Sequence, residues 1–168
     1  GFTVTTTYRQ KVRTAAVFGQ ADWRVANRLV ATAGLRYEDE NRRLIGLSTS
    51  IPEFAVPFAT NVNRTVGLSE VSGKFALTFE ATDNANVYAS ISRGVKSGGF
   101  TTYNTLVPEQ ADPFRPEVLW SYEAGLKSEL FDNSLRVNVG GFYYDYSDQQ
   151  IQGFYIDPTF GAVGQIVN

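Results

Sequence analysis

Residue types that commonly act in catalysis are scarce in this sequence. None of its 168 residues is Cys or His, which excludes thiol nucleophiles, disulfides, Ser-His triads and the HExxH zinc motif from this chain. Glu117 and Glu123 would share one face of a strand, but about 20 Å of extended chain separates them, too far for a glycosidase pair. Lys96-Ser97-Gly98-Gly99 lacks the spacing of a phosphate-binding loop. We therefore expect no catalytic residue, no metal site and no cofactor in this chain.

Residues suited to an anionic aromatic ligand gather instead in two long connecting segments. Arg and Lys pair with anionic groups, and aromatic rings stack or form cation–π contacts. In or beside segment 97–116 the candidates are Arg93, Lys96, Phe100, Tyr103 and Arg115. In segment 39–70 they are Arg42, Arg43, Phe54, Phe58 and Arg64. Exposed loops commonly carry such residues, so an ordinary solvated role is the alternative for each of them.

The segments that must position these residues alternate in polarity with a period of two, which predicts β-strands. The six predicted strands span residues 14–23, 29–38, 71–80, 87–96, 117–128 and 135–144. Each has one apolar face, such as the face that carries Leu35 and Tyr37, and one face with the ionised side chains, such as Arg36 and Glu38. Arg93 is the exception to this separation. A face so free of charge is expected to contact either lipid or a dry core.

The connections between these segments alternate strictly between short and long. Residues 24–28, 81–86 and 131–134 form short links rich in turn-forming Asn and Asp, whereas 39–70, 97–116 and the tail after 145 are long. This predicts an all-β, antiparallel up-and-down meander with every short turn at one end. Outer-membrane barrels show this asymmetry of loops, and soluble sandwiches have no reason to.

Aromatic residues on the apolar face fall into two predicted bands. Trp23 and Phe79 lie beside the short turns, and a second group lies toward the long loops: Tyr37, Trp120, Tyr122 and Tyr143. Two such bands around an aliphatic zone are typical of the aromatic girdles of a membrane barrel. Aromatic packing inside a soluble core is the alternative interpretation.

The polar face is expected to look into an enclosed interior. The charged residues predicted to face it, where they could pair across strands, are Arg36, Glu38, Lys74, Glu80, Glu123 and Lys127. Six strands are too few to close a bacterial barrel, and 151–168 is predicted to rise as a seventh strand to Asp157-Pro158 and turn back. The chain is therefore expected to be a fragment of a barrel or to self-associate through open sheet edges. No apolar stretch is long enough for a transmembrane helix, and a net charge of −2 gives no basic field for nucleic acid.

Several motifs resemble the barrel of TonB-dependent outer-membrane receptors. The first is Ala16-Val17-Phe18-Gly19-Gln20-Ala21-Asp22-Trp23 with the strand containing Ala33-Gly34-Leu35-Arg36-Tyr37, and the second covers residues 87–100. The third joins Phe114-Arg115-Pro116-Glu117, Tyr122-Glu123-Ala124-Gly125-Leu126-Lys127 and Phe142-Tyr143-Tyr144-Asp145-Tyr146-Ser147-Asp148. The resemblance covers nearly the whole chain, and residues 40–70 match it least.

The resemblance implies that residues 1–168 are a single segment of a barrel of twenty-two strands, which in this family encloses an N-terminal plug. Neither the plug nor the TonB-binding box is visible in this chain. The implied function is active uptake of ferric siderophores, vitamin B12 or similarly scarce nutrients across the outer membrane of a Gram-negative bacterium. The implied partners are outer-membrane lipid, TonB through absent parts of the protein, and a small ligand. Haem is disfavoured because this segment has no His to ligate iron.

Two other functions remain open from the sequence. A soluble β-sandwich could use the long loops to bind a ligand, with its apolar faces stacked in a core. An outer-membrane enzyme, such as a protease or phospholipase, would share the barrel, although the lack of His argues against its chemistry in this segment.

Overall fold

A computed structural model describes residues 3–54, 58–132 and 134–168, and in these ranges the chain is built mainly of β-strands. One antiparallel sheet contains six strands in chain order: β1 (Thr5–Ala26), β2 (Leu29–Ser50), β3 (Val62–Thr82), β4 (Ala85–Lys96), β5 (Glu117–Leu130) and β6 (Leu135–Ser147). A short 3₁₀ helix, η1 (Pro108–Ala111), precedes β5. The last strands, β7 (Ile151–Asp157) and β8 (Gly161–Val167), pair only with each other. The predicted antiparallel meander is confirmed.

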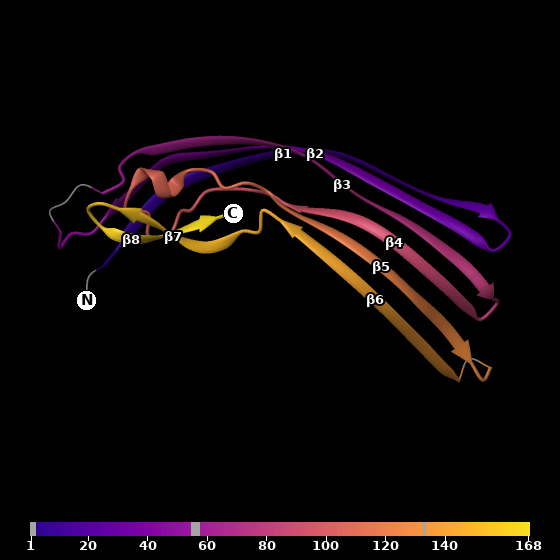
Figure 1. Ribbon diagram of the computed structural model, residues 1–168. Coiled ribbons are helices and arrows are strands. Elements are labelled where there is room, and N and C mark those ends of the chain that lie inside the picture. Colours follow the sequence, from indigo (N-terminus) through magenta and orange to yellow (C-terminus); the bar gives the residue numbers. More distant parts are fainter. Residues whose placement is uncertain (1–2, 55–57, 133) are drawn as a thin grey trace.

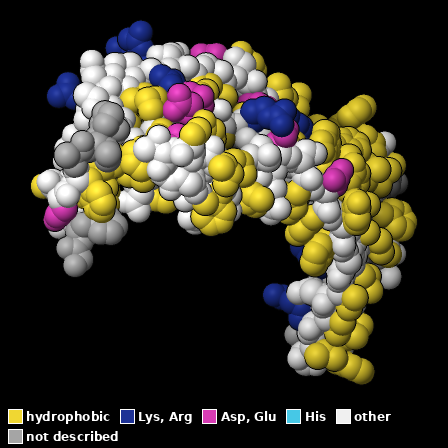
Figure 2. All heavy atoms as spheres, turned by 60° about the vertical axis from the view of Figure 1, so that its left-hand side comes forward, with side chains coloured by type: hydrophobic (Ala, Val, Ile, Leu, Met, Phe, Trp, Pro, Cys, Tyr) yellow, Lys and Arg dark blue, Asp and Glu magenta, His cyan; other side chains and the backbone are white. Residues whose placement is uncertain are grey.

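The six-stranded sheet is a single curved layer rather than half of a stacked pair. Short turns lie at one end of it, and the longer links, η1 and the β7–β8 hairpin lie at the other (Figure 1). Hydrophobic side chains lie along the outer side of the descending part of the arch, whose other side is hollow (Figure 2). Val17 and Leu35 on this outer face are 67% and 69% exposed, so this is not the two-sheet stack of the sandwich alternative. Among the described residues, no helix has the length and apolar character needed to cross a membrane.

Two of the three short turns are tighter than the sequence predicts, and the third spans residues 131–134 as predicted. Asn27-Arg28 joins β1 to β2, and Asp83-Asn84 joins β3 to β4. The third turn starts with Phe131 and Asp132, whose φ angles of 52° and 50° lie in the left-handed region. Asn133 of this predicted turn lies outside the described residues. The predicted alternation of short and long links is confirmed for the five connections between β1 and β6.

The first long link is much shorter than predicted. Because β2 continues to Ser50 and β3 begins at Val62, the predicted loop 39–70 contracts to residues 51–61. The prediction that Arg42, Arg43 and Arg64 lie in this loop is therefore wrong, since they lie on β2 and β3. Residues 55–57 of the predicted loop lie outside the described residues.

The physical reason for the error is that the two faces of these strands exchange polarity partway along their length. On the outer face, β2 changes from Ala31, Ala33, Leu35 and Tyr37 to Asp39, Asn41 and Arg43. The change falls at one level on three strands, because Asp39 lies opposite Ala15 of β1 and Ser69 of β3. Beyond that level the concave face gains buried apolar residues, such as Leu44 of β2 and Leu68 of β3, beside the ion-paired Glu40, Arg42 and Arg64. The clean separation of an apolar outer face from a charged concave face therefore ends at this level.

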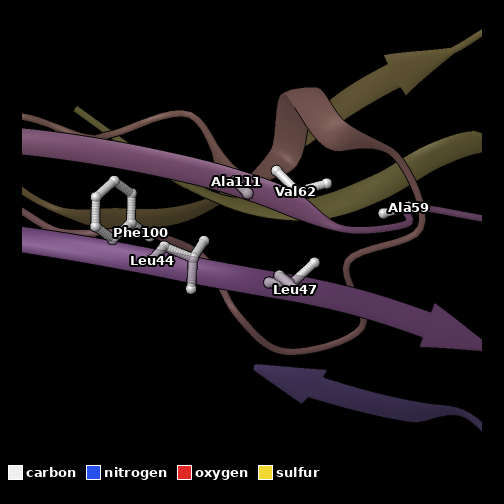
Figure 3. Close-up of a cluster of buried hydrophobic side chains, with 6 residues drawn as sticks. All are labelled: Leu44, Leu47, Ala59, Val62, Phe100 and Ala111. Atoms are coloured by element: carbon white, nitrogen blue, oxygen red, sulfur yellow. The ribbon is translucent and has the colours of Figure 1, made fainter. Parts of the chain in front are cut away.

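The main core lies on the concave face at the end of the sheet near the long links. Its buried residues come from β2, β3 and the links 51–61 and 97–116: Leu44, Leu47, Ala59, Val62, Phe100 and Ala111 (Figure 3). Val66 packs against this cluster. The segment that carries η1 thus covers the concave face at the end of the sheet opposite the short turns.

The tail forms strands where predicted, but with a different partner. Ile151–Asp157 and Gly161–Val167 pair antiparallel, which confirms a strand, a turn after Asp157 and a returning strand. The prediction that the first of them extends the main sheet as its seventh strand is wrong. The chain leaves β6 at Asp148, whose φ is 52°, and the hairpin folds under the sheet (Figure 1).

Substitution of Gly125 in β5 tests how tightly the sheet is packed at this position. A Cβ there would lie 2.7 Å from Tyr88 Cε1 and 2.7 Å from the carbonyl oxygen of Val139, whereas one at Gly141 would meet no atom within 4 Å. Gly125→Ala is expected to lower the free energy of unfolding by about 1–3 kcal/mol, because Tyr88 and the backbone must shift. Gly141→Ala should change it by less than about 0.5 kcal/mol. Urea unfolding of the intact protein measures both, and equal effects would contradict the packing described.

Candidate ligand-binding site

The candidate site lies at the loop end of the concave face, where four parts of the chain meet. These are the end of β4, the link 97–116 with η1, the start of β5, and the β7–β8 hairpin. The link and the hairpin form a platform that closes part of the concave side at this end (Figure 1). One set of side chains holds the platform together through hydrogen bonds, and a different set is exposed to solvent.

Gln110 of η1 joins the link to the hairpin. Its side chain is fully buried, and its Oε1 accepts hydrogen bonds from the backbone N–H groups of Leu106 and Val107 at 2.6 and 3.0 Å. Its Nε2 donates to the carbonyl oxygen of Gly164 in β8 at 2.7 Å and to that of Asn104 at 3.4 Å. A buried amide whose donors and acceptor are all used in this way specifies the fold of the platform.

Thr101 provides a second join between the link and the hairpin. Its buried Oγ1 accepts a hydrogen bond from the backbone N–H of Ile166 at 3.0 Å. Thr105 Oγ1 donates in turn to the carbonyl oxygen of Thr101 at 3.4 Å. Neither these two residues nor Gln110 could be identified from the sequence, because polar residues in a loop give no signal that they are buried.

A polar network closes the junction between the strand ends and the hairpin. Lys96 pairs with Glu117 at 3.5 Å, and the Glu117 carboxylate also accepts a hydrogen bond from the backbone N–H of Gln150 at 3.0 Å. Gln150 Nε2 donates to the carbonyl oxygens of Ser97 and Arg115, both at 3.1 Å. These contacts hold the start of the hairpin against the ends of β4 and β5.

Three of the predicted ligand-binding residues are exposed, with Lys96 and Arg115 at this junction and Tyr103 in the link 97–116. The side chains of Lys96 and Arg115 are 64% and 71% exposed, and Tyr103 is 42% exposed. Arg115 pairs with Asp148 at 2.7 Å, but in an exposed setting where a charged ligand could compete for it. They offer two cations and one phenol ring to solvent.

The structure places the other two predicted residues in supporting positions. Phe100 is 7% exposed and belongs to the core cluster, so its ring packs under the platform. Arg93 donates to Glu70 at 3.1 Å and to the carbonyl oxygen of Val71. This pairing explains how a cation is accommodated on the apolar face of β4.

The candidates of the predicted first loop are dispersed. Arg42 pairs with the buried Glu40 at 2.5 Å on β2, and Arg64 joins β3 to the platform through Asp112 at 2.7 Å. Phe58 stacks on Phe160 of the hairpin turn with ring centroids 5.5 Å apart. Phe54 is half-exposed, and Arg43 lies on the outer face of β2, on the other side of the sheet from the platform.

The six charged residues predicted to face an interior share the concave face of the sheet, and most already have polar partners. Arg36 pairs with Glu38 along β2 rather than across strands. Arg24 pairs with Glu80 at 3.2 Å, and Glu123 accepts a hydrogen bond from Ser121 at 3.2 Å.

Two cations complete this set. Lys127 lies over the Tyr88 ring, with Nζ 5.3 Å from its centroid. Lys74 has no ion-pair partner in the described ranges. These six residues are therefore charge-balanced overall, whereas the exposed Lys96 and Arg115 lie at the loop end of the concave face.

Comparison with known proteins adds the family. The sequence model described as "TonB dependent receptor-like, beta-barrel" matches residues 1–168. The ferric yersiniabactin uptake receptor FyuA of Yersinia pestis superposes with a TM-score of 0.76 at 22% identity, over 88% of this chain and 22% of that receptor.

Two further receptor structures share the fold. The siderophore receptor PiuA of Acinetobacter baumannii gives a TM-score of 0.65 at 17% identity, over 95% of this chain and 22% of that one. The alcaligin outer-membrane receptor FauA of Bordetella pertussis gives 0.55 at 16%, over 94% and 25%. The chain thus spans about a quarter of the length of these receptors.

Substitution of Gln110 tests the platform. Gln110→Ala leaves the N–H groups of Leu106 and Val107 and the carbonyl oxygen of Gly164 without their side-chain partner, at about 1–3 kcal/mol of local stability. Hydrogen exchange of segment 104–111 should then accelerate at least about fivefold, while the centre of β5 keeps its protection. Glu109→Ala, at the exposed neighbouring residue, is the control. Unchanged exchange in the Gln110 variant would contradict the role of this side chain.

Proposed function

Because the chain belongs to the TonB-dependent receptor-like β-barrel family, we propose that it forms part of the wall and ligand-capturing mouth of an outer-membrane active transporter. The transporter takes up ferric siderophores or similarly scarce nutrients, with energy delivered through TonB. The observation that carries this proposal is the sheet itself, with an uncovered apolar belt outside, charges inside, and a folded platform at the loop end.

The outer belt supports placement in the outer membrane of a Gram-negative bacterium. Trp23 and Phe79 lie toward the short turns and Tyr37 lies toward the loops, with Phe75 as an aromatic residue between these two levels. Tyr122 and Tyr143 sit opposite each other on β5 and β6, with ring centroids 6.2 Å apart. Rings at the two interfaces and aliphatic residues between them match the requirements of a lipid bilayer.

Lys96, Tyr103 and Arg115 are the proposed ligand contacts at the mouth. Ferric siderophores are often anionic and carry aromatic or hydroxamate groups, so exposed cations and an exposed phenol ring suit them. Phe100 and Arg93 act indirectly, since Phe100 supports the platform and Arg93 holds Glu70. The charge-balanced concave wall would face the plug domain of the complete receptor.

A pair of substitutions tests which face meets lipid. Ala89 is on the outer face of β4, and the next residue, Ser90, is on the concave face opposite Glu123. Ala89→Lys should destabilise the full-length receptor in lipid vesicles by about 2–4 kcal/mol, because the ammonium group enters the apolar layer. Ser90→Lys gains Glu123 as a partner and should cost far less. Urea unfolding in vesicles measures both, and a larger loss for Ser90→Lys would reverse the assignment of faces.

Uptake measurements test the function directly. Cells that express the full-length receptor should accumulate iron-55 from at least one member of a siderophore panel, and deletion of TonB should abolish that uptake. Arg115→Ala should raise the apparent Kd for the transported chelate about 5- to 30-fold, the usual range for loss of one important contact.

Arg136→Ala is the matched control. Its side chain is also 71% exposed and pairs with a carboxylate, Glu129, at 2.5 Å, but it lies near the short turns. It should leave the Kd unchanged. Uptake of no chelate in the panel, or uptake independent of TonB, would contradict the proposed function.

A further inference from the structure

Four cations stand on the outer face of the sheet just beyond the apolar belt. They are Arg9, Lys11 and Arg13 on β1 and Arg43 on β2, and all four are exposed. None of them has an ion-pair partner in the part of the chain that the structure describes. By contrast, Arg24 and Arg28 near the short turns each pair with a carboxylate, Glu80 or Asp83.

The register brings these cations together. Lys11 lies directly opposite Arg43, and Arg13 lies opposite Asn41. Lys11, Arg13, Asn41 and Arg43 line one shallow hollow of about 310 Å³. Like charges directly opposite each other destabilise a sheet, so this arrangement favours an anion bound between them.

The acid that precedes this group on the same face does not neutralise it. Asp39 lies opposite Ala15 of β1 and accepts a hydrogen bond from Ser69 Oγ at 2.9 Å. Four cations against one carboxylate leave an excess of three positive charges.

The distance of these four cations from the apolar belt indicates which layer of the membrane would surround them. Asn41, opposite Arg13, and Arg43, opposite Lys11, follow Tyr37 by four and six residues on β2. These separations are about 13 and 20 Å along the strand, or about 9 and 14 Å along the membrane normal for a strand tilted by about 45°. That range lies above the acyl chains, in the headgroup layer of the outer leaflet.

We propose that Arg9, Lys11, Arg13 and Arg43 form a binding site for the phosphate groups of glycolipids in the outer leaflet, such as lipid A. The inference rests on the proposed function, because it requires the apolar belt to lie in the outer membrane with the long loops outside. Phosphate oxygens would accept charge-assisted hydrogen bonds from the guanidinium and ammonium groups. Phosphates carried on a sugar headgroup extend farther from the acyl chains than those of simple phospholipids, which suits the height of Lys11 and Arg43.

The test uses the full-length receptor in phosphatidylcholine vesicles with no addition, with lipid A, with enzymatically dephosphorylated lipid A, or with inorganic phosphate in solution. Only lipid A is expected to raise the unfolding temperature and to remain bound in native mass spectrometry. Each cation near an anionic lipid surface strengthens binding about fivefold. Arg43→Gln should therefore weaken lipid A binding about fivefold, and the triple change Lys11→Gln, Arg13→Gln and Arg43→Gln about 100-fold.

Lys74→Gln is the matched control, since Lys74 is an exposed cation without an ion-pair partner in the described ranges but lies on the opposite face. It should bind lipid A as the unchanged receptor does. If dephosphorylated lipid A or inorganic phosphate raised the unfolding temperature of the unchanged receptor as much as lipid A does, the proposal would be overturned. It would also be overturned if Lys74→Gln weakened lipid A binding as much as the substitutions on the outer face do. A receptor that inserts and transports but ignores lipid A phosphates overturns this inference alone, whereas one that fails to enter any vesicle overturns the proposed function as well.

Discussion

A β-strand has two faces, and the polarity of each face must match its surroundings along the whole length of the strand. In β1, β2 and β3 the surroundings change once, at the level of Ala15, Asp39 and Ser69. On the turn side of that level, apolar residues point outward and charged residues point to the concave side. On the loop side the outer face becomes polar, and the concave face carries the buried core beneath the folded platform. The rest of the structure depends on this exchange of polarity.

The two halves of the sheet are consequently stabilised in different ways. On the turn side no second layer of the described chain covers the outer belt, so in the proposed membrane setting burial in acyl chains would replace the core that a soluble protein forms. In the upper half a conventional core packs Phe100 and Ala111 of the link onto Leu44 and Val62 of the strands. Gln110 then fixes the link and the hairpin with buried hydrogen bonds, so the exposed residues at the mouth rest on an ordered support.

Much of the turn side of the sheet could be predicted from sequence. Period-two alternation with charges on one face identifies both the strands and the direction in which their side chains point. The extensions of β2 and β3 could not be predicted because Arg43 of the outer face and Arg42 and Arg64 of the concave face lie in one polar stretch, which is typical of a loop. The partner of β7 depends on a left-handed residue at Asp148 and on Gln150, and no periodicity encodes either. The burial of Gln110 and Phe100 depends on tertiary packing of an irregular segment. The motifs around Tyr122-Glu123 and Phe142-Tyr143 led to the family, although they locate no ligand contact.

The exchange of polarity can be measured residue by residue, because this chain has no Cys and a spin label can be attached at single introduced sites. Labels at outer-face positions 31, 33, 35, 37, 39, 41 and 43 of β2, in a full-length receptor free of other reactive Cys, would be read by electron paramagnetic resonance in vesicles. Labels up to position 37 should show high access to oxygen and low access to a water-soluble nickel complex, and labels from position 39 onward should show the reverse. Access of the nickel complex to positions 33 and 35 as high as to 41 and 43 would contradict a lipid-facing belt that ends at this level.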